Sequence, residues 1–167
     1  MRPSGALLAA AALAAGPVGA DLPPPPEIAT AFDVHPVVAG RRFMAVTANP
    51  LATAAAVDIL RAGGSAVDAA IAAQMVLGLV EPQSSGIGGG GLMLHFDARR
   101  RRLDAWDGRE TAPLSASAGQ LQDAAGRPLD FRDAARDPRA VGTPGLVAML
   151  ALAHRAAGRL PWARLFE

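Results

Sequence analysis

The sequence predicts an α/β fold in which two consecutive helices precede a pair of short strands. Helix start and stop signals occur twice between residues 49 and 82, and two six-residue runs of strand character flank a charged turn between residues 92 and 107. A further helix signal follows near residue 143. The chain of 167 residues is long enough for one domain with a core of ordinary size.

The first twenty residues have the pattern of a secretory signal peptide. Arg2 precedes an apolar run over residues 6–15, and the small residues at 18–20 suit signal peptidase. The run is shorter than the roughly 20 residues that span a bilayer. An uncleaved anchor is the alternative, but Pro17 would break its helix. We therefore expect cleavage after Ala20 and a periplasmic or secreted protein without a membrane span.

Composition excludes several classes of function. Residues 21–42 are Pro-rich and aperiodic, which predicts a linker ahead of a domain over residues 43–167. Cysteine is absent, so there is no disulfide, thiol nucleophile or cysteine metal site. Sixteen basic residues, all arginine, face fifteen acidic ones, and a net charge of +1 gives no electrostatic footprint for nucleic acid.

The first predicted elements are a strand and a helix. Residues Phe43–Ala48 alternate between apolar and polar or small side chains, as a strand does. Asn49 can then cap a helix that has Pro50 in its first position, where the missing N–H is harmless. This helix should end near Ala62, because Gly63-Gly64 provides a left-handed stop.

The second helix should begin directly after this stop. Ser65 can cap it, Asp68 lies in its first turn, and Pro82 marks its exit. The two helices therefore form an αα-hairpin, and their many alanines allow a close approach. The apolar positions spaced for a buried stripe are Val57, Leu60, Val67, Ile71 and Met75.

A strand pair is predicted over Leu92–Asp97 and Arg102–Asp107, with the run Arg99–Arg102 at its tip. We expect these arginines to be a solvated turn that discourages edge-to-edge association, and a partner-binding patch is the alternative. The polar segment 121–141 predicts a loop with one short helix.

Two helix starts are predicted near the end of the sequence. Thr143 and Pro144 can begin a helix that stops at Gly158. Pro161 can begin another, and the sequence ends at Glu167 within an amphipathic pattern without a stop signal. We therefore expect a domain truncated at its C-terminus.

The glycine-rich stretch resembles a nucleotide-binding turn only in its spacing. Gly86, Gly88 and Gly91 match G-x-G-x-x-G, but the dinucleotide site needs a strand before the glycines and a helix after them. Here a predicted helix precedes them and a strand follows, so we expect no nucleotide and no cofactor. Ser84 and Ser85 lack the G-x-S-x-G elbow of a serine nucleophile.

The histidines do not point to a metal. They lie in a linker, a strand and a helix without the spacing of metal ligands, and structural roles are expected for all three: His35, His95 and His154.

Charged residues gather where the second predicted strand ends, in the stretch DAWDGRETAP that contains Asp104, Asp107, Arg109 and Glu110. The planar guanidinium of Arg109 can hold a carboxylate at two points, and neighbouring acids can fix its orientation. From these residues alone, a surface salt bridge is the simpler interpretation.

Three motifs in order resemble the N-terminal part of the large subunit of gamma-glutamyltransferases, which are N-terminal-nucleophile hydrolases. They are residues 47–94 with the stretch SSGIGGGG, residues 107–113 with DGRETAP, and residues 142–145 with GTPG. The resemblance extends from about Met44 to the end. It implies the family's αββα sandwich, with only its N-terminal part present. It also implies that the glycines form a tight passage near the substrate pocket, through close backbone approach and positive φ.

The family resemblance also implies a chemistry. Its enzymes cleave themselves, and the released small subunit begins with a threonine that is both nucleophile and, through its amine, base. The threonine takes the gamma-glutamyl group from glutathione or a related amide and passes it to water, an amino acid or a peptide. In the family, the arginine of the RE.AP motif binds the α-carboxylate of the glutamyl group, and this role falls on Arg109.

The resemblance places the threonine-led small subunit beyond Glu167, so no catalytic residue is assigned within this chain. Thr111 and Thr143 lie inside large-subunit motifs and cannot replace that threonine. The expected partners are a gamma-glutamyl compound such as glutathione and the small subunit from the same precursor. The alternatives are a related amide acylase, and a non-catalytic exported remnant or binding module.

Overall fold

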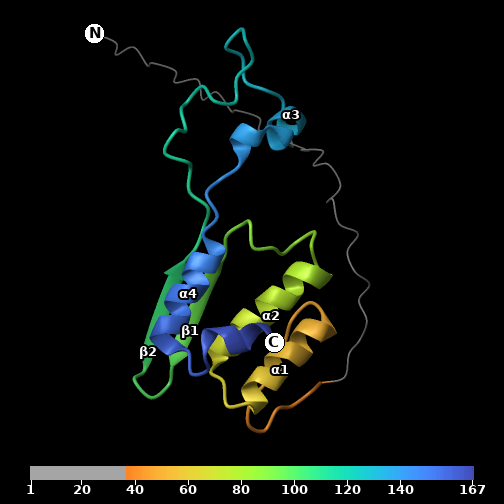
Figure 1. Cartoon of the computed structure of the whole chain (residues 1–167), viewed down its shortest axis with the longest axis vertical. Helices are drawn as coiled ribbons and strands as arrows, with labels where there is room; N and C mark the ends of the chain where they lie inside the picture. Colours follow the sequence, from red (N-terminus) through yellow and green to blue (C-terminus); the bar gives the residue numbers. More distant parts are fainter. Residues whose placement is uncertain (1–36) are drawn as a thin grey trace, which may run out of the picture. The chain divides into compact units, whose positions relative to one another are not determined.

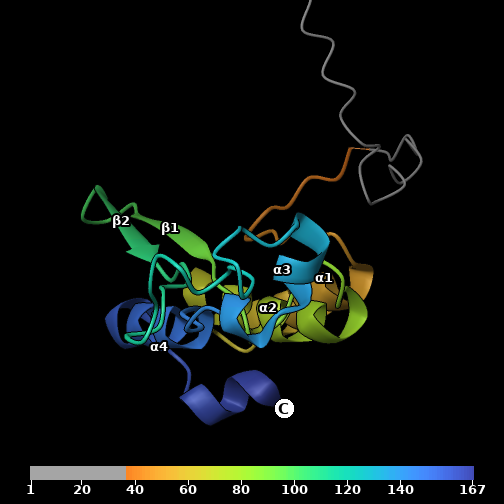
Figure 2. The same ribbon diagram turned by 90° about the horizontal axis from the view of Figure 1, so that it is seen from above.

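The computed structural model of the protein describes residues 37–167. The predicted signal peptide, most of the predicted linker and His35 lie outside the described residues. The elements in chain order are α1 (Pro50–Arg61), α2 (Ala66–Val80), β1 (Leu92–Asp97), β2 (Arg102–Asp107), α3 (Phe131–Arg136), a 3₁₀ helix (Pro138–Ala140), α4 (Leu146–Ala157) and a second 3₁₀ helix (Trp162–Phe166). Figure 1 shows α2 between α1 and α4, and Figure 2 shows the same order from above.

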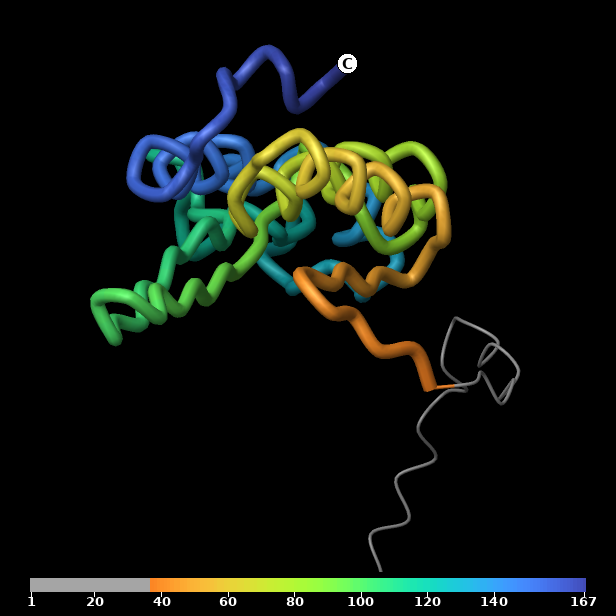
Figure 3. The backbone as a smooth tube through the Cα atoms, turned by 90° about the horizontal axis from the view of Figure 1, so that it is seen from below, coloured from red at the N-terminus to blue at the C-terminus, as the bar shows by residue number. Residues whose placement is uncertain are grey.

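Helices α1 and α2 form the predicted αα-hairpin. The side chain of Asn49 accepts a hydrogen bond of 3.0 Å from the N–H of Leu51, so it caps α1 as expected. Gly63 has a φ of +89°, which confirms the left-handed stop. The two helices run side by side in Figure 3.

The contact between α1 and α2 consists of small side chains: Ala52 and Ala56 of α1 are buried with Ala69 and Ala73 of α2. The small side chains at its centre allow the two backbones to approach closely, and larger side chains pack around them: Ile59, Leu60, Val76 and Leu77. The predicted stripe is therefore only partly right, because Val57 and Leu60 are half-buried while these alanines are buried.

The strands β1 and β2 pair antiparallel over the predicted residues, with Leu92 opposite Asp107 and Asp97 opposite Arg102. One face carries Met93 and Trp106, which pack against the core beside α4. The opposite face is exposed in the described part of the chain, with the large apolar side chains Leu92, Leu94, Phe96 and Leu103.

Helix α4 supplies much of the hydrophobic core. Its buried side chains pack with those of α2 and of the final 3₁₀ helix, and the cluster consists of Val67, Ile71, Leu146, Met149, Leu150, Ala153 and Leu165. None of the helices within residues 37–167 is long and apolar enough to cross a membrane.

A buried carboxylate connects this core to the start of α2. Asp68 is 0% exposed, and its Oδ2 accepts hydrogen bonds from the backbone N–H groups of Ser65 (2.8 Å), Arg159 (2.9 Å) and Leu160 (3.2 Å). The N–H of Asp68 donates in turn to Oγ of Ser65 over 3.1 Å, which completes a capping box. Asp68 thus joins the first turn of α2 to the segment that follows α4.

Burial and hydrogen bonding act in opposite directions on this carboxylate. Burial alone would raise the pKa of Asp68, but hydrogen bonds from the N–H groups of Ser65, Arg159 and Leu160 lower it below its usual value. The other carboxylate oxygen, Oδ1, lies 3.5 Å from Nε2 of His154. That Nε2 is also 2.9 Å from the carbonyl oxygen of Leu160, so it carries the hydrogen and donates. His154 is therefore structural, as predicted.

The structure corrects two of the predicted elements. Residues Phe43–Ala48 are not a strand, because they pair with no strand among the described residues. Helix α4 begins at Leu146 with Gly145 as N-cap, not at Thr143. Thr143 is instead drawn into a backbone bridge with Thr111, with N–H to O distances of 2.8 and 3.3 Å.

The segment from Pro161 is a short 3₁₀ helix, Trp162–Phe166, in place of the predicted amphipathic helix. The predicted short helix within residues 121–141 is confirmed as α3. Asp130 caps it by accepting hydrogen bonds from the N–H groups of Arg132 and Asp133.

Candidate functional site

Arg109 lies where β2 ends, directly after the buried Gly108. The N–H of Gly108 donates to the carbonyl of Gly91 over 2.9 Å, and Gly91 donates back over 3.3 Å, so the ladder continues one pair beyond the strands. A Cβ on Gly108 would lie 2.6 Å from the Cβ of Met149 on α4. Only glycine fits there, and this close approach fixes where the chain leaves the sheet.

The backbone of Arg109 is held while its side chain reaches into solvent. Its N–H donates to Oδ1 of Asp107 over 2.8 Å. The side chain is 76% exposed, and Nη1 donates to Oε2 of Glu110 over 2.6 Å. Among the described residues this is its one side-chain hydrogen bond, so four of the five guanidinium N–H groups stay open to a ligand.

Glu110 is confined by glycines on two sides. A Cβ on Gly90 would lie 2.7 Å from Oε2 of Glu110, and one on Gly142 would lie 3.0 Å from its Cβ. A side chain on either glycine would therefore compete with Glu110 for this space. The carboxylate that occupies it holds one edge of the Arg109 guanidinium.

Two hollows meet at Glu110. One, of about 440 Å³, is lined by the glycine-rich loop, Gln74 and Glu110. The other, of about 370 Å³, is lined by Arg109–Pro113, Gln120 and residues 139–142. A larger groove of about 610 Å³ between α1, α2 and the final 3₁₀ helix includes neither Arg109 nor Glu110 and is mainly apolar. Of these three, only the two smaller hollows have the charged and amide side chains around Arg109 and Glu110 that could orient a ligand.

Polar contacts brace the glycine-rich loop at its start. Nε2 of Gln74 donates to Oγ of Ser85 over 2.7 Å. Glu81 accepts hydrogen bonds from the side chains of Asn49 and Gln83, and these bonds lower the pKa of Glu81. Ser85 is thus a hydrogen-bond acceptor in this arrangement.

The three separated motifs converge at this place. The carbonyl of Gly89 accepts hydrogen bonds of 3.2 Å from the N–H groups of both Gly145 and Leu146, at the start of α4. Thr111 and Thr143 form the adjoining bridge. The first two N–H groups at the start of α4 are therefore bound to a backbone carbonyl of the glycine-rich loop.

The structure brings some of the predicted residues together and separates others. Glu110 pairs with Arg109, whereas Asp104 pairs with Arg102 at 2.9 Å and takes no part in the site. Gly90 and Gly91 make the predicted close approach, whereas an added Cβ on Gly86 or Gly88 would meet nothing within 4 Å. The expected positive φ is wrong, since none occurs in residues 86–91. The contacts of Gly90 and Gly142 with Glu110 were not predicted, because these three residues are distant from one another in the sequence.

No group of three or more residues suited to a metal ion occurs within the described part of the chain.

Solved structures with a similar arrangement are N-terminal-nucleophile hydrolases. The gamma-glutamyltranspeptidase of Helicobacter pylori aligns with a TM-score of 0.71 and 31% identity, over 78% of this chain and 37% of that chain. The gamma-glutamyltranspeptidase of Pseudomonas nitroreducens, complexed with L-DON, aligns with a TM-score of 0.68 and 31% identity, over 74% of this chain and 36% of that chain. A cephalosporin acylase from Bacillus halodurans aligns with a TM-score of 0.59 and 28% identity, over 81% of this chain and 26% of that chain. The fold is thus a part of the N-terminal-nucleophile hydrolase fold.

The family follows from the sequence comparisons. The model of the Gamma-glutamyltranspeptidase family matches residues 52–167, and the chain belongs to this family. It is 38% identical over 130 residues to the glutathione hydrolase proenzyme of Bacillus subtilis strain 168, over 77% of this chain and 22% of that protein. It is 43% identical over 120 residues to glutathione hydrolase 7 of Rattus norvegicus, in an alignment that covers 72% of this chain and 17% of that protein. The chain thus spans about a fifth of the length of such relatives.

Proposed function

We propose that this chain forms the N-terminal part of the large subunit of an exported gamma-glutamyltransferase or glutathione hydrolase, in which Arg109 binds the α-carboxylate of the gamma-glutamyl donor. The position of Arg109 is the observation that carries the proposal. It follows a strand end fixed by glycine packing, it is mostly exposed, and a confined carboxylate pairs with one of its N–H groups.

The charge arrangement suits a carboxylate ligand. Glu110 neutralises part of the guanidinium charge and holds one edge, while the other N–H groups can make a two-point contact with an incoming carboxylate. A donor held in this way would present its γ-carbonyl carbon in one orientation. Positioning of this kind promotes a reaction without any contact between Arg109 and the reacting atoms.

The remaining chemistry belongs to a threonine-led small subunit from the same precursor. Its hydroxyl oxygen would attack the γ-carbonyl carbon, its own amine would take the hydroxyl proton, and that proton would pass to the departing amine. Water, an amino acid or a peptide would then attack the acyl-enzyme and release the threonine. This chain contributes substrate binding to that sequence, and alone it would have no activity.

A second candidate is an amide acylase of the same fold. The likeness to a cephalosporin acylase over 81% of this chain supports it. The two candidates differ in their donors, since a gamma-glutamyl donor presents an α-carboxylate and an α-amine at the far end from the scissile amide, whereas a simple acyl amide has neither. A non-catalytic exported remnant or binding module would turn over neither donor.

The test uses the product of the complete reading frame that carries this segment. Arg109→Lys keeps the charge but removes the planar fork. Arg127→Lys is the matched control, because Arg127 is 78% exposed and also pairs with a neighbouring acid, Asp123, at 2.8 Å. Release of a chromophore from a gamma-glutamyl anilide measures donor use, and a gel of precursor cleavage measures self-processing.

Arg109→Lys should lower kcat/KM by about tenfold to a hundredfold, the range expected when a charge-assisted contact is lost. Self-processing should be nearly unchanged, because it does not use the substrate carboxylate. The control should match the wild type in both assays. Unchanged donor kinetics in Arg109→Lys would refute the carboxylate-binding role, and turnover of an acyl amide in place of the anilide would favour the acylase.

A further inference from the structure

A cationic hollow lies at the other end of the β1–β2 hairpin from Arg109. It has a volume of about 740 Å³ and is lined by arginines from three separate segments: Arg42, Arg99, Arg100 and Arg159. The sequence alone predicted only the arginine run at the hairpin tip. In the structure, residue 42 ahead of α1 and residue 159 after α4 bring further charge to the same place.

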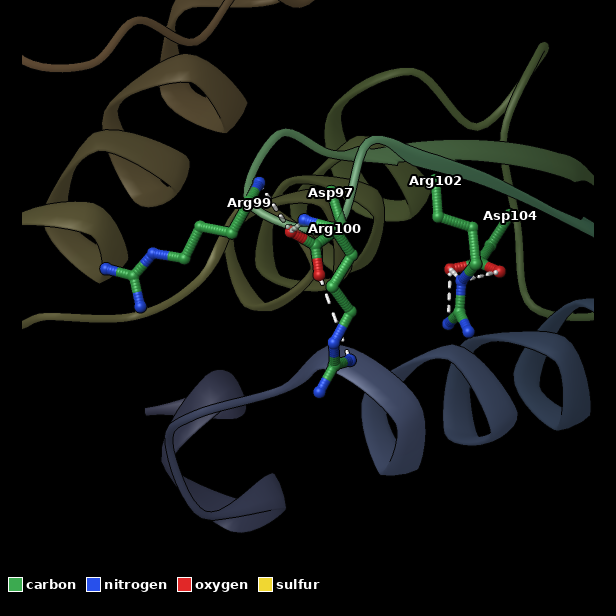
Figure 4. A network of polar contacts seen from close by, with 5 residues as sticks. All are labelled: Asp97, Arg99, Arg100, Arg102 and Asp104. Carbon is green, nitrogen blue, oxygen red and sulfur yellow. Dashed lines mark hydrogen bonds and ion pairs between the residues drawn. The ribbon is translucent and has the colours of Figure 1, made fainter.

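Few acidic groups oppose this charge. Asp97 is the one carboxylate in the lining, and its Oδ1 already accepts hydrogen bonds from the backbone N–H groups of Arg99 (2.9 Å) and Arg100 (3.2 Å). Its Oδ2 lies 3.8 Å from Nη1 of Arg100, which is a loose ion pair. Figure 4 shows the Asp97 side chain between Arg99 and Arg100, whose side chains extend in different directions.

Three lining arginines have no ionic partner. Within residues 37–167 no carboxylate lies within 4.0 Å of the guanidinium groups of Arg42, Arg99 or Arg159. By contrast, Arg102 at the base of the tip is bound to Asp104 through both Nε and Nη2, as Figure 4 also shows. The hollow therefore keeps an excess of positive charge.

Other groups complete the wall. The backbone at Gly63–Ala66 brings the start of α2 to the hollow, but the capping box of Ser65 and Asp68 already occupies that helix end, so the positive charge comes from the arginines. His95 lines it too, and its buried Nδ1 has no hydrogen-bond partner among the described residues. Phe96, 61% exposed, adds an apolar ring beside the arginines.

We infer that this hollow is a binding site for a small ligand with two or more anionic oxygen groups, of the polyphosphate or polycarboxylate type. Its volume lies within the roughly 300 to 1,000 Å³ of small-molecule sites. Arginines from three separate segments match a ligand with several charged ends better than a single ion. The inference is independent of the function proposed for Arg109, since the two sites share no lining residue.

The test is calorimetric titration of the purified chain with tripolyphosphate, citrate and inorganic phosphate at about 50 mM salt, where screening is moderate. The double variant Arg99→Gln/Arg159→Gln removes two partnerless charges of the wall. Its control is Arg101→Gln/Arg155→Gln, which removes the same net charge from exposed arginines outside the lining. Circular dichroism checks that both variants fold.

Tripolyphosphate or citrate should bind the wild type more tightly than inorganic phosphate does, and the one that binds more tightly identifies the ligand type. The wall variant should weaken that binding by about tenfold or more, and the control by less than about twofold. Equal weakening in the two variants would mean general electrostatic attraction and would overturn the site, as would no binding of either polyanion.

If the wall variant does not fold, changes in the amide chemical shifts of the wild type on addition of the polyanion show whether the ligand binds in the hollow. On titration, shifts should concentrate at residues 63–66 and 95–100, and shifts spread over the other arginines would overturn the site.

Discussion

Removing the carboxylate of Asp68 should destabilise the protein more than any other single acidic substitution in the described part of the chain. Asp68→Ala deletes the acceptor of three backbone N–H groups, on Ser65, Arg159 and Leu160, in a place where Asp68 is 0% exposed. Asp68→Asn keeps one oxygen for these donors but loses the negative charge. The two variants thus separate the loss of the acceptor from the loss of charge.

The expected size follows from the contacts. A hydrogen bond to a charged group contributes about 1.5 to 3 kcal/mol, and a buried donor left without a partner costs about 1 to 3 kcal/mol. Because the three donors share one oxygen, their contributions do not add in full, and we expect about 3 to 5 kcal/mol for Asp68→Ala. For Asp68→Asn we expect about 1 to 2 kcal/mol, since neutral acceptors bind more weakly.

Urea denaturation at pH 7, followed by circular dichroism, measures these differences. The matched control is Asp58→Ala on α1, where an exposed carboxylate pairs with Arg61 at 2.9 Å, and it should change stability by no more than about 0.5 kcal/mol. If Asp68→Ala were as stable as the control, Asp68 would not hold the two segments together.

The pH dependence of Asp68→Asn gives a second check with a defined sign. The pKa of Asp68 is lowered in the folded protein, because hydrogen bonds to the carboxylate outweigh burial. Its contribution is therefore complete above the unfolded pKa of about 3.9 and is lost as the pH falls through the folded pKa. The stability difference between wild type and Asp68→Asn should be constant from about pH 5 to 7 and shrink below about pH 4. A difference that grew on acidification would refute the ionised state assumed here.

Three further predictions concern export, activity and the glycine-rich loop. Mass spectrometry of exported protein should find an N-terminus at Asp21, since the apolar run ends before Ala20, and a mature chain that retained Met1 would contradict the signal peptide. The 167-residue chain alone should release no chromophore from a gamma-glutamyl anilide, because the proposed function assigns the nucleophile to the small subunit. Turnover above a buffer blank would exclude this interpretation. Gly90→Ala should lower the unfolding midpoint, because a Cβ at Gly90 meets the backbone carbonyl oxygen of Gly108 at 2.7 Å as well as Oε2 of Glu110 at 2.7 Å. Gly86→Ala should not, because nothing lies within 4 Å of a Cβ there, and equal midpoints would show that the loop can move aside.

The sequence predicted the elements whose signals are local. Asn49 and Ser65 cap helices through side chains within three residues, and the hairpin follows from alternation on both sides of one turn, so α1, α2, β1 and β2 were recognisable. The strand predicted over Phe43–Ala48 failed for a non-local reason. Alternation describes a strand only when a partner is present, and the described residues provide none.

The start of α4 shows how distant contacts override a local signal. Thr143 and Pro144 form a good helix start in isolation, but Thr143 pairs with Thr111, and the next N–H groups donate to Gly89. The same limit applies to the candidate site. Arg109 stood out through its residue type and its place after a strand, whereas the fit of Glu110 against glycines more than 15 residues away could be seen only in the structure.

The hydrogen bonds of Asp68 imply an order of events while the chain is being synthesised. The capping box with Ser65 spans three residues, and the hairpin of α1 and α2 needs only neighbouring sequence, so both can form as soon as this region leaves the ribosome. The N–H of Arg159 comes 91 residues after Asp68, which at about 5 to 20 residues per second means a wait of roughly 5 to 18 s. During that interval the carboxylate of Asp68 caps α2 but is still exposed to solvent. Pulse labelling of amide hydrogens on stalled chains should therefore find α2 protected before α4 has been synthesised. Protection of α2 only after residue 160 had emerged would show instead that the pair of α1 and α2 is stable only when the segment after α4 packs against it.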